Sequence, residues 1–330
     1  MKDRKNYKEE LRQWAFANGM SKFGVAPVDR FGEARRGQKP EDLLPGAKSV
    51  IVMCIKLLDG ATSAIYRKYE DGMDDVHGIY GTYGYTLGPT FHQAVVVSEM
   101  ANKIEMETGE LALPSFTGGP LVNGGAFSLR HAANAAGLGE FGWNGLMLTP
   151  EFGPRNRFCA VITTLELEPD PMYHGPRLCN PEQCHICVDA CPTGAITMPG
   201  TIPALEVHCG DKTSAYCALI NHKCKMACHT IVKAAGGKED LVSLDASEPE
   251  VEHVLDTKPF EKEGMQGNPT WRCGQCLTNC PVGNWKGHFY DTGLVDHLLE
   301  NKKQEETTIE KEPEQVIAAL GLPEIKGDGR

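Results

Sequence analysis

Two similar cysteine motifs are the residues of this 330-residue chain that most clearly suggest chemistry. The first is Cys184-His-Ile-Cys187-Val-Asp-Ala-Cys191-Pro192, and the second is Cys273-Gly-Gln-Cys276-Leu-Thr-Asn-Cys280-Pro281. The two-residue spacing lets two thiolates of one tight loop bind adjacent irons, and the Cys-Pro step starts a short helix that carries the third sulfur away. The pattern predicts two [4Fe–4S] clusters between about Cys179 and Cys280.

The spacing also predicts which thiols share a cluster, because in two-cluster ferredoxins the last cysteine of each motif ligates the other cluster. In such a ferredoxin-like segment, one cluster is expected to use Cys184, Cys187 and Cys280. The other is expected to use Cys273, Cys276 and Cys191. Cys179 is the natural fourth ligand of the first cluster, although the usual spacing places a cysteine at position 181. For the second cluster the choices are Cys209, Cys217, Cys224 and Cys228, and Cys209 is favoured because it follows Cys191 after a short connection.

Other metals remain alternatives for these thiols. Paired Cys-x2-Cys motifs also build structural zinc sites. The proline after each last cysteine and the surplus of thiols favour clusters. The stretch from Cys217 to His229 either holds a further metal or places ordinary thiols near the clusters. Thirteen cysteines in a reducing compartment indicate metal binding or catalysis rather than disulfides.

A glycine loop, Gly137-Leu-Gly139-Glu-Phe-Gly142, matches the dinucleotide-binding pattern G-x-G-x-x-G. That pattern binds a dinucleotide only where it follows a strand and precedes a helix. Here a helical stretch precedes the loop and a strand-like stretch follows it, so NAD binding is disfavoured. The loop is either a glycine helix end that turns the chain tightly, or backbone that lies against a large flat cofactor.

The elements that must position these residues are a mixture of helices and strands. Helices are expected over residues 3–18, 91–108 and 129–136, with modest helices over 291–302 and 312–320. Strands are expected over 23–26, 50–55, 146–149 and 158–165, and residues 59–89 are expected to form a loop. Because strands and helices do not alternate cleanly, the sequence favours an α+β fold over a doubly wound sheet.

The cysteine content changes sharply along the chain. Residues 1–173 contain only Cys54 and Cys159, whereas residues 174–290 contain the other cysteines. This change predicts a core domain over 1–173 and an iron–sulfur domain over 174–290. C-terminal helices and an acidic tail are expected over 291–330.

Charge and hydropathy restrict the expected setting. Lys and Arg total 33 against 44 Asp and Glu, a formal net charge of -11, which disfavours nucleic acid because phosphate repels an acidic protein. No apolar run reaches the roughly 18 to 20 residues that span a bilayer, and neither a secretory nor a twin-arginine signal is present. The sequence therefore predicts a cytoplasmic protein that binds neither membrane nor nucleic acid.

The chain resembles the cobalamin-dependent reductases with two clusters, namely the reductive dehalogenases and the epoxyqueuosine reductases. The likeness rests on Leu44-Pro-Gly-Ala-Lys-Ser-Val-Ile-Val52, Ala136-Gly-Leu-Gly-Glu-Phe-Gly-Trp-Asn-Gly145, Leu148-Thr-Pro-Glu-Phe-Gly-Pro-Arg155 and the cysteine motifs, and covers most of residues 5–285. The Thr-Pro-Glu-Phe-Gly-Pro-Arg segment is closest to the dehalogenases. The resemblance implies a nitroreductase-like core that holds base-off cobalamin, and a bacterial-ferredoxin-like module that delivers electrons to it.

The resemblance also implies where the corrinoid binds. The Gly137–Gly145 loop would admit the corrin edge, with no protein histidine on cobalt; His77, in an imperfect corrinoid motif, is interpreted as a loop residue. The guanidinium groups of Arg155 and Arg157 would pair with the phosphate of the nucleotide tail, or alternatively bridge to surface carboxylates. The expected cofactor-binding residues are Asn123, Gly137, Gly139, Gly142, Asn144, Gly145, Pro150, Gly153, Arg155 and Arg157.

The chain departs from both families at positions expected near the substrate. Trp143 replaces their usual Lys or Arg, and Asn123 replaces the proton-donating Asp of epoxyqueuosine reductases. The catalytic Tyr of dehalogenases would fall near Phe91 or His92. The candidate catalytic residues are His131, His92 and Tyr83, each of which is alternatively a structural residue.

The sequence therefore predicts an oxidoreductase that reductively cleaves a carbon–heteroatom bond in a small molecule. Its electrons would come from a low-potential donor such as ferredoxin or flavodoxin. One alternative is a tRNA epoxyqueuosine reductase, which the acidic charge and Asn123 disfavour. A second is a non-catalytic iron–sulfur electron-transfer protein or corrinoid activator, and a third places a flavin in the core.

Overall fold

The computed structural model describes residues 4–63, 83–84, 90–123, 125–237, 239–257 and 273–283. The helices predicted over 291–302 and 312–320, and most of the loop predicted over 59–89, lie outside the described residues. Within the described ranges, no helix is both long enough and apolar enough to cross a membrane.

Four antiparallel strands form the central sheet, in the order β1-β2-β6-β3. They are β1 (Lys22–Pro27), β2 (Ser49–Lys56), β3 (Ala112–Phe116) and β6 (Asn156–Thr163). The apolar run of β2 is buried in the middle of the sheet, as a continuous run of that length predicts. β3 was not expected from the sequence. It lies at the edge of the sheet, where Pro114 is tolerated because the position needs no ladder donor.

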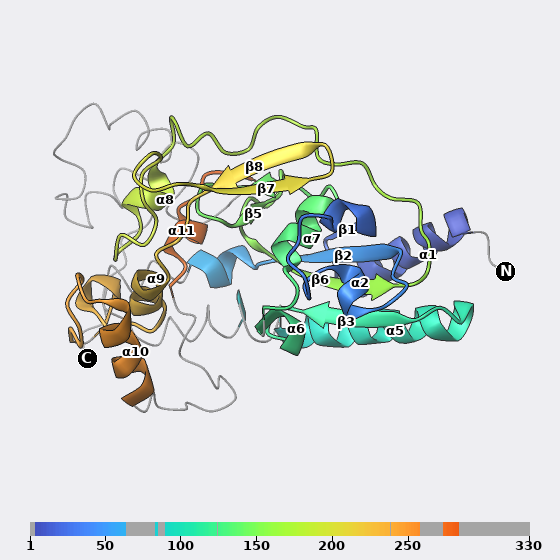
Figure 1. Ribbon diagram of the computed structural model, residues 1–330, viewed down its shortest axis with the longest axis horizontal. Coiled ribbons are helices and arrows are strands. Elements are labelled where there is room, and N and C mark those ends of the chain that lie inside the picture. The colour runs from blue at the N-terminus through green and yellow to red at the C-terminus, as the bar shows by residue number, and fades with distance from the viewer. Residues whose placement is uncertain are drawn as a thin grey trace, which may run out of the picture.

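Helices cover both faces of this sheet (Figure 1). On one face, α1 (Arg4–Ala17) and α5 (Gln93–Thr108) pack in a core that includes Ile51 of β2. On the other face, α7 (Leu129–Ala135) packs in a core that includes Val50 of β2. Successive side chains of a strand point to opposite faces, so one apolar strand supplies both cores.

Most elements of the first half were predicted correctly. The helices over 3–18, 91–108 and 129–136, and the strands over 23–26, 50–55 and 158–165, are present with small shifts at their ends. The antiparallel sheet confirms a mixed fold of the α+β type rather than a doubly wound sheet. The division of the chain near residues 173 and 290 remains a prediction.

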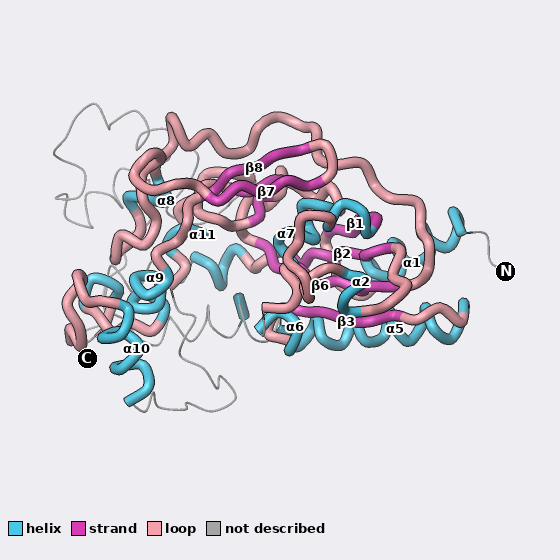
Figure 2. The backbone as a smooth tube through the Cα atoms, viewed as in Figure 1, coloured by secondary structure: helices cyan, strands magenta, loops and turns pink. Residues whose placement is uncertain are grey.

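The remaining elements are short. Two hairpins join β4 (Glu140–Phe141) to β5 (Met147–Leu148), and β7 (Leu205–Cys209) to β8 (Lys212–Tyr216). The helices of the cysteine-rich part are α8 (Ile186–Asp189), α9 (Asn221–Cys228), α10 (Glu248–Thr257) and α11 (Gln275–Thr278). The other short helices are η1 (Val28–Phe31), α2 (Pro40–Leu43), α6 (Pro120–Asn123) and η3 (Lys233–Ala235). In Figure 2, α8, α9, α10 and α11 lie at the end of the molecule away from α1.

Candidate functional site

The structure brings four of the predicted cysteines together into a first group. Burial, and then three neighbouring thiols, raise the pKa of Cys187. Those neighbours are Cys280, Cys179 and Cys184. Burial also raises the pKa of Cys280 to about 12, although the Val282 backbone N–H and the Arg155 guanidinium act in the opposite direction. This group has the composition predicted for the first cluster.

A second group surrounds Cys276. Burial raises the pKa of Cys276, and the thiols around it raise it further. Those thiols belong to Cys273, Cys224, Cys187 and Cys191. Because Cys187 belongs to the first group, the two groups lie next to each other. Three of the four ligands predicted for the second cluster are therefore together, and the thiols of Cys224 and Cys228 lie beside them.

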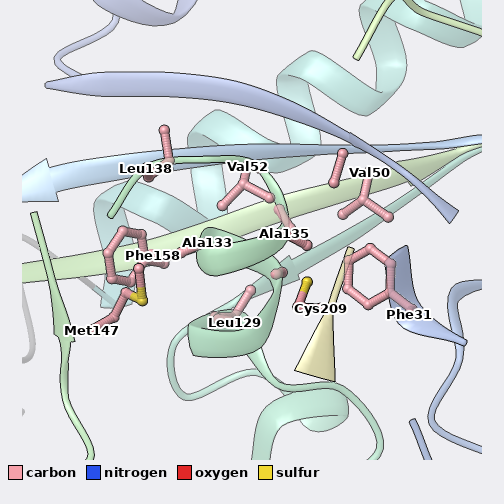
Figure 3. Packing of buried hydrophobic residues seen from close by; sticks show 14 of the residues in the cluster. Phe31, Val50, Val52, Leu129, Ala133, Ala135, Leu138, Met147, Phe158 and Cys209 are labelled. Atoms are coloured by element: carbon pink, nitrogen blue, oxygen red, sulfur yellow. The ribbon is translucent and has the colours of Figure 1, made fainter. Parts of the chain in front are cut away.

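Cys209 does not join this group, which corrects the prediction for the fourth ligand. Its thiol donates to the Arg30 carbonyl oxygen at 3.5 Å and is packed in the sheet core beside Phe31 and Leu129 (Figure 3). Burial raises the pKa of Cys209 to about 11, and the charged groups that act on it are Arg30 and Asp211 rather than other thiols. The alternation of Leu205-Glu-Val-His-Cys209 gives the reason, because the last residue of this strand faces the core.

The sequence signal for Cys224 is its spacing to Cys228. Residues four apart share one face of a helix, and in α9 the two sulfurs are 3.9 Å apart. The Cys228 thiol lowers the pKa of Cys224 by hydrogen bonding, whereas that bond and burial raise the pKa of Cys228. The pair thus places two thiols of one helix face beside Cys273 and Cys276.

Backbone N–H groups donate to several of these sulfurs. The Trp143 N–H lies 3.3 Å from the Cys179 sulfur, and the Ala195 N–H lies 3.2 Å from the Cys191 sulfur. The buried Cys217 sulfur accepts from the Thr197 N–H at 3.4 Å. Such donors favour the thiolate and are one of the protein's means of tuning a cluster.

The described thiols are not spaced like the ligands of a single metal ion. Among the described residues, no three His, Cys, Asp or Glu side chains are placed so that they could hold one metal ion. A cubane binds its four thiolates at the corners of a body of irons and sulfides, which needs a wider spacing of sulfurs than a single ion does. An all-thiol set with N–H donors matches the chemistry of such a cluster.

The Gly137–Gly142 loop is a helix end followed by a tight hairpin. Gly137 follows α7 with φ of +73°, a conformation that favours glycine, and β4 and β5 pair directly after it. A Cβ on Gly139 would lie 1.8 Å from the Leu148 carbonyl oxygen. The observed order of helix then strand is the order predicted, and it is the reverse of that in a dinucleotide-binding loop. These glycines are explained by contacts within the chain.

Side chains of this loop contact the cysteine motifs. The Glu140 carboxylate accepts from the Cys179 N–H at 3.4 Å, and the Asn144 amide donates to the Cys276 carbonyl oxygen at 3.0 Å. The Trp143 indole donates to the Thr197 carbonyl oxygen at 2.8 Å, and its ring packs against cysteines of both groups. The loop thus joins the sheet domain to both groups of thiols.

The environment of Arg155 is neither the phosphate site nor the surface position that was predicted. It was expected to bind a phosphate or to lie on the surface, but it is only 1% exposed. Its guanidinium donates to the carbonyl oxygens of Leu277 at 3.2 Å and Cys280 at 2.8 Å, and also to that of Val282. A guanidinium enclosed by backbone carbonyls is not available to a ligand phosphate.

Residues of the central sheet and residues of the second group of thiols together line a cavity of about 510 Å³. Phe127, Met147 and Phe158 give it apolar surface, and Cys273 and Cys276 also line it. Of the residues predicted to bind the cofactor, Arg157 lines this cavity. Pro150 lies in the turn closed by the bridge between Thr149 and Gly153. His77, and the side chain of Asn123, lie outside the part of the chain that the structure describes.

The predicted catalytic residues are not gathered at this cavity. The His92 ring is hydrogen-bonded to the Asn18 carbonyl oxygen at 2.8 Å, and Tyr83 is 51% exposed. The His131 ring is 2.6 Å from the Ser128 hydroxyl and lines a separate cavity of about 360 Å³ beside Tyr216. Sequence gives no signal for the His92 contact, because Asn18 is distant along the chain.

The burial of His131 predicts a pH effect on stability. Burial, with a smaller contribution from Arg130, lowers the pKa of His131 from 6.5 to about 4. Between these pH values His131 is protonated in the unfolded chain but not in the folded chain. The free energy of unfolding should therefore fall as the pH drops from about 6.5 towards 4. In His131→Phe, which keeps an aromatic ring beside Phe141, this fall should be shallower. Denaturant unfolding of both proteins across that range measures it, and parallel curves would contradict the prediction.

Comparison with known proteins finds relatives in two groups of reductases. No protein-family model matches the chain. A tetrachloroethene reductive dehalogenase of Desulfitobacterium hafniense is 42% identical over 190 residues, which are 57% of this chain and 29% of that protein. An epoxyqueuosine reductase of Staphylococcus aureus is 25% identical over 226 residues, 61% of this chain and 55% of that protein. The chain thus spans less than two thirds of either relative, and both names agree with the predicted oxidoreductase.

Solved structures show the same fold. A catabolic reductive dehalogenase matches 97% of this chain and 36% of its own, with a TM-score of 0.53 and 16% identity. A second match with the same TM-score of 0.53 is a reductive dehalogenase described in terms of B12-dependent dehalogenation. The mixed helix and strand architecture is therefore similar to that of reductive dehalogenases.

These comparisons contradict the prediction that excluded nucleic acid and required a small-molecule substrate. Epoxyqueuosine reductases are among the relatives, at 25% identity for that of Staphylococcus aureus. The physical reason is that nucleic acid contacts a local group of cations, whereas the net charge of -11 sums over the whole chain. Net charge does not decide the partner.

Proposed function

We propose that this chain is a cobalamin-dependent reductase with two [4Fe–4S] clusters, and that it reductively cleaves a carbon–heteroatom bond. The observation that carries the proposal is the cavity of about 510 Å³ with Cys273 and Cys276 in its wall. A cluster on these thiols would lie beside any group bound in the cavity. Cubane clusters reach the low potentials that such reductions require.

The thiol groups support one ligand set for each cluster. The first cluster would be held by Cys179, Cys184, Cys187 and Cys280. The second would be held by Cys191, Cys273, Cys276 and Cys224. Cys224 is chosen because its thiol acts on that of Cys276. In this proposal the cysteine-rich part is a ferredoxin-like module, and the sheet domain is a nitroreductase-like core.

The cavity fits a corrinoid in its chemistry. The apolar side chains of Phe127, Met147 and Phe158 suit the flat face of a macrocycle, and its volume is within the range of cofactor pockets. Gln38, Asn156 and Arg157 would hold the amide side chains and the phosphate at its edge. When bound, cobalamin supplies a cobalt centre able to remove a heteroatom from carbon.

The exchange of ligands between the motifs is tested by pairs of serine variants. Cys191→Ser should lose the cluster that also uses Cys273, not the one that uses its neighbours in sequence. Adding Cys273→Ser should then remove no further iron, whereas adding Cys184→Ser should remove nearly all of it. Iron and acid-labile sulfide are measured in anaerobically purified protein. The opposite result for the two double variants would show that each motif ligates its own cluster.

Two substrates distinguish the candidate reactions. The 42% identity to a dehalogenase favours dehalogenation. The chain matches a larger share, 55%, of the epoxyqueuosine reductase, which favours epoxyqueuosine reduction. Cobalamin-loaded, reduced protein is incubated with tetrachloroethene or with a tRNA stem loop carrying epoxyqueuosine. Release of chloride or formation of queuosine, dependent on the corrinoid, supports the proposal and selects the reaction. If no product forms from either substrate, the result counts against the proposal.

A further inference from the structure

Arg155 connects the sheet domain to the segment that carries Cys280. Its guanidinium donates to the carbonyl oxygens of Leu277 at 3.2 Å, Cys280 at 2.8 Å and Val282. These residues extend from α11 past the last thiol of the second motif. One side chain therefore fixes the backbone on both sides of a predicted cluster ligand.

The packing around Arg155 leaves this arrangement little freedom. A Cβ on Gly153 would lie 1.9 Å from the Val282 carbonyl oxygen, and a Cβ on Gly283 would lie 2.4 Å from the Gly153 nitrogen. The two segments thus touch backbone to backbone. The guanidinium between them is 1% exposed, so its position is set by the chain rather than by solvent.

The charge of Arg155 is permanent, because a guanidinium stays protonated in proteins. A positive charge held in a poorly solvated site interacts more strongly with nearby charge than one in water. Reduction adds one electron to a cluster and makes it more negative. A fixed cation beside one of its thiolates therefore stabilises the reduced form, and net charge is one of the factors that set cluster potentials.

We propose that Arg155 is a positioning residue for the cluster ligated by Cys280, and that its buried charge raises the reduction potential of that cluster. The inference rests on the proposed function, since it requires the two clusters. It assigns to the Gly153-Pro-Arg155 segment a role in electron transfer instead of phosphate binding.

Two variants separate charge from shape. Arg155→Lys keeps the positive charge but loses the fork that reaches several carbonyls, and Arg155→Gln loses the charge while keeping an amide donor. The potentials of both clusters are measured in the anaerobic holoprotein by redox titration with electron paramagnetic resonance. Repeating the titration in a Cys273→Ser background identifies the cluster that uses Cys280.

In Arg155→Gln, the Cys280 cluster is expected to need a more negative potential for half reduction. We expect at least a tenfold change in its oxidised-to-reduced ratio at a fixed potential, or about 59 mV for one electron. The other cluster should shift less, and Arg155→Lys should stay close to the wild type. Selective loss of the Cys280 cluster from the Gln variant would support the positioning role.

Three outcomes would overturn the inference. One is an iron-replete Gln variant with unchanged potentials, and another is an equal shift in the Lys and Gln variants. The third is equal loss of both clusters from the Gln variant, which would indicate general misfolding. Failure of the proposed function is recognised separately, because the wild-type protein would then lack the clusters before any residue is changed.

Discussion

Replacing Cys224 by serine is expected to lower the iron content of the anaerobically purified protein from about eight to about four atoms per chain. The reason is that the Cys224 thiol acts directly on that of Cys276, in the group that also contains Cys273 and Cys191. Losing one of four thiolate ligands should release that cubane, while the first group keeps its own. Iron and acid-labile sulfide assays measure the change.

Cys209→Ser is the matched control for this prediction. Cys209 also lies between the two motifs in sequence, but its thiol is in the sheet core beside Phe31. This variant should keep both clusters, whatever it does to stability. Full iron in Cys224→Ser together with half the iron in Cys209→Ser would show that the structure assigns the wrong ligand.

Gly139→Ala is expected to destabilise the whole protein by at least about 2 kcal/mol, the cost of serious overpacking. The added Cβ would lie 1.8 Å from the Leu148 carbonyl oxygen, which is backbone and cannot turn aside. The hairpin of β4 and β5 would have to shift, and with it the Glu140 and Asn144 contacts to the cysteine motifs. Denaturant unfolding measures the free energy of unfolding.

Gly60→Ala is the control for this substitution. A Cβ on Gly60 would have no heavy atom within 4 Å, so the change should be neutral or slightly stabilising. Equal stability of the two variants would contradict the account of the Gly137–Gly142 loop. Loss of corrinoid binding in Gly139→Ala would in any case not identify a cofactor contact, because the fold itself is changed.

The sequence was most informative where local spacing determines geometry. The apolar run Val50–Ile55 predicts a central strand, and the helical spacing of Tyr7, Leu11 and Trp14 predicts α1. The cysteine motifs predict which thiols of neighbouring turns lie together. For the strand and the helix, the pattern lies within a few consecutive residues; for the thiols, it lies in the repetition of one motif at two places in the chain.

Long-range contacts could not be predicted in the same way. Cys209 and Cys224 are both cysteines between the motifs, and only the pairing of β7 with β8 and its packing on the core separates them. Arg155 is charged, and charged residues are usually exposed. Its burial depends on carbonyls more than a hundred residues later, for which sequence periodicity has no signal.

Cobalamin binding tests the central claim most directly. Anaerobically purified protein is incubated with cobalamin and passed through gel filtration, and the visible spectrum of the protein peak is recorded. The account predicts a corrinoid in an amount equal to the protein, in addition to the cluster absorbance. Cluster absorbance alone, with all of the corrinoid in the small-molecule fractions, would contradict it and leave an electron carrier.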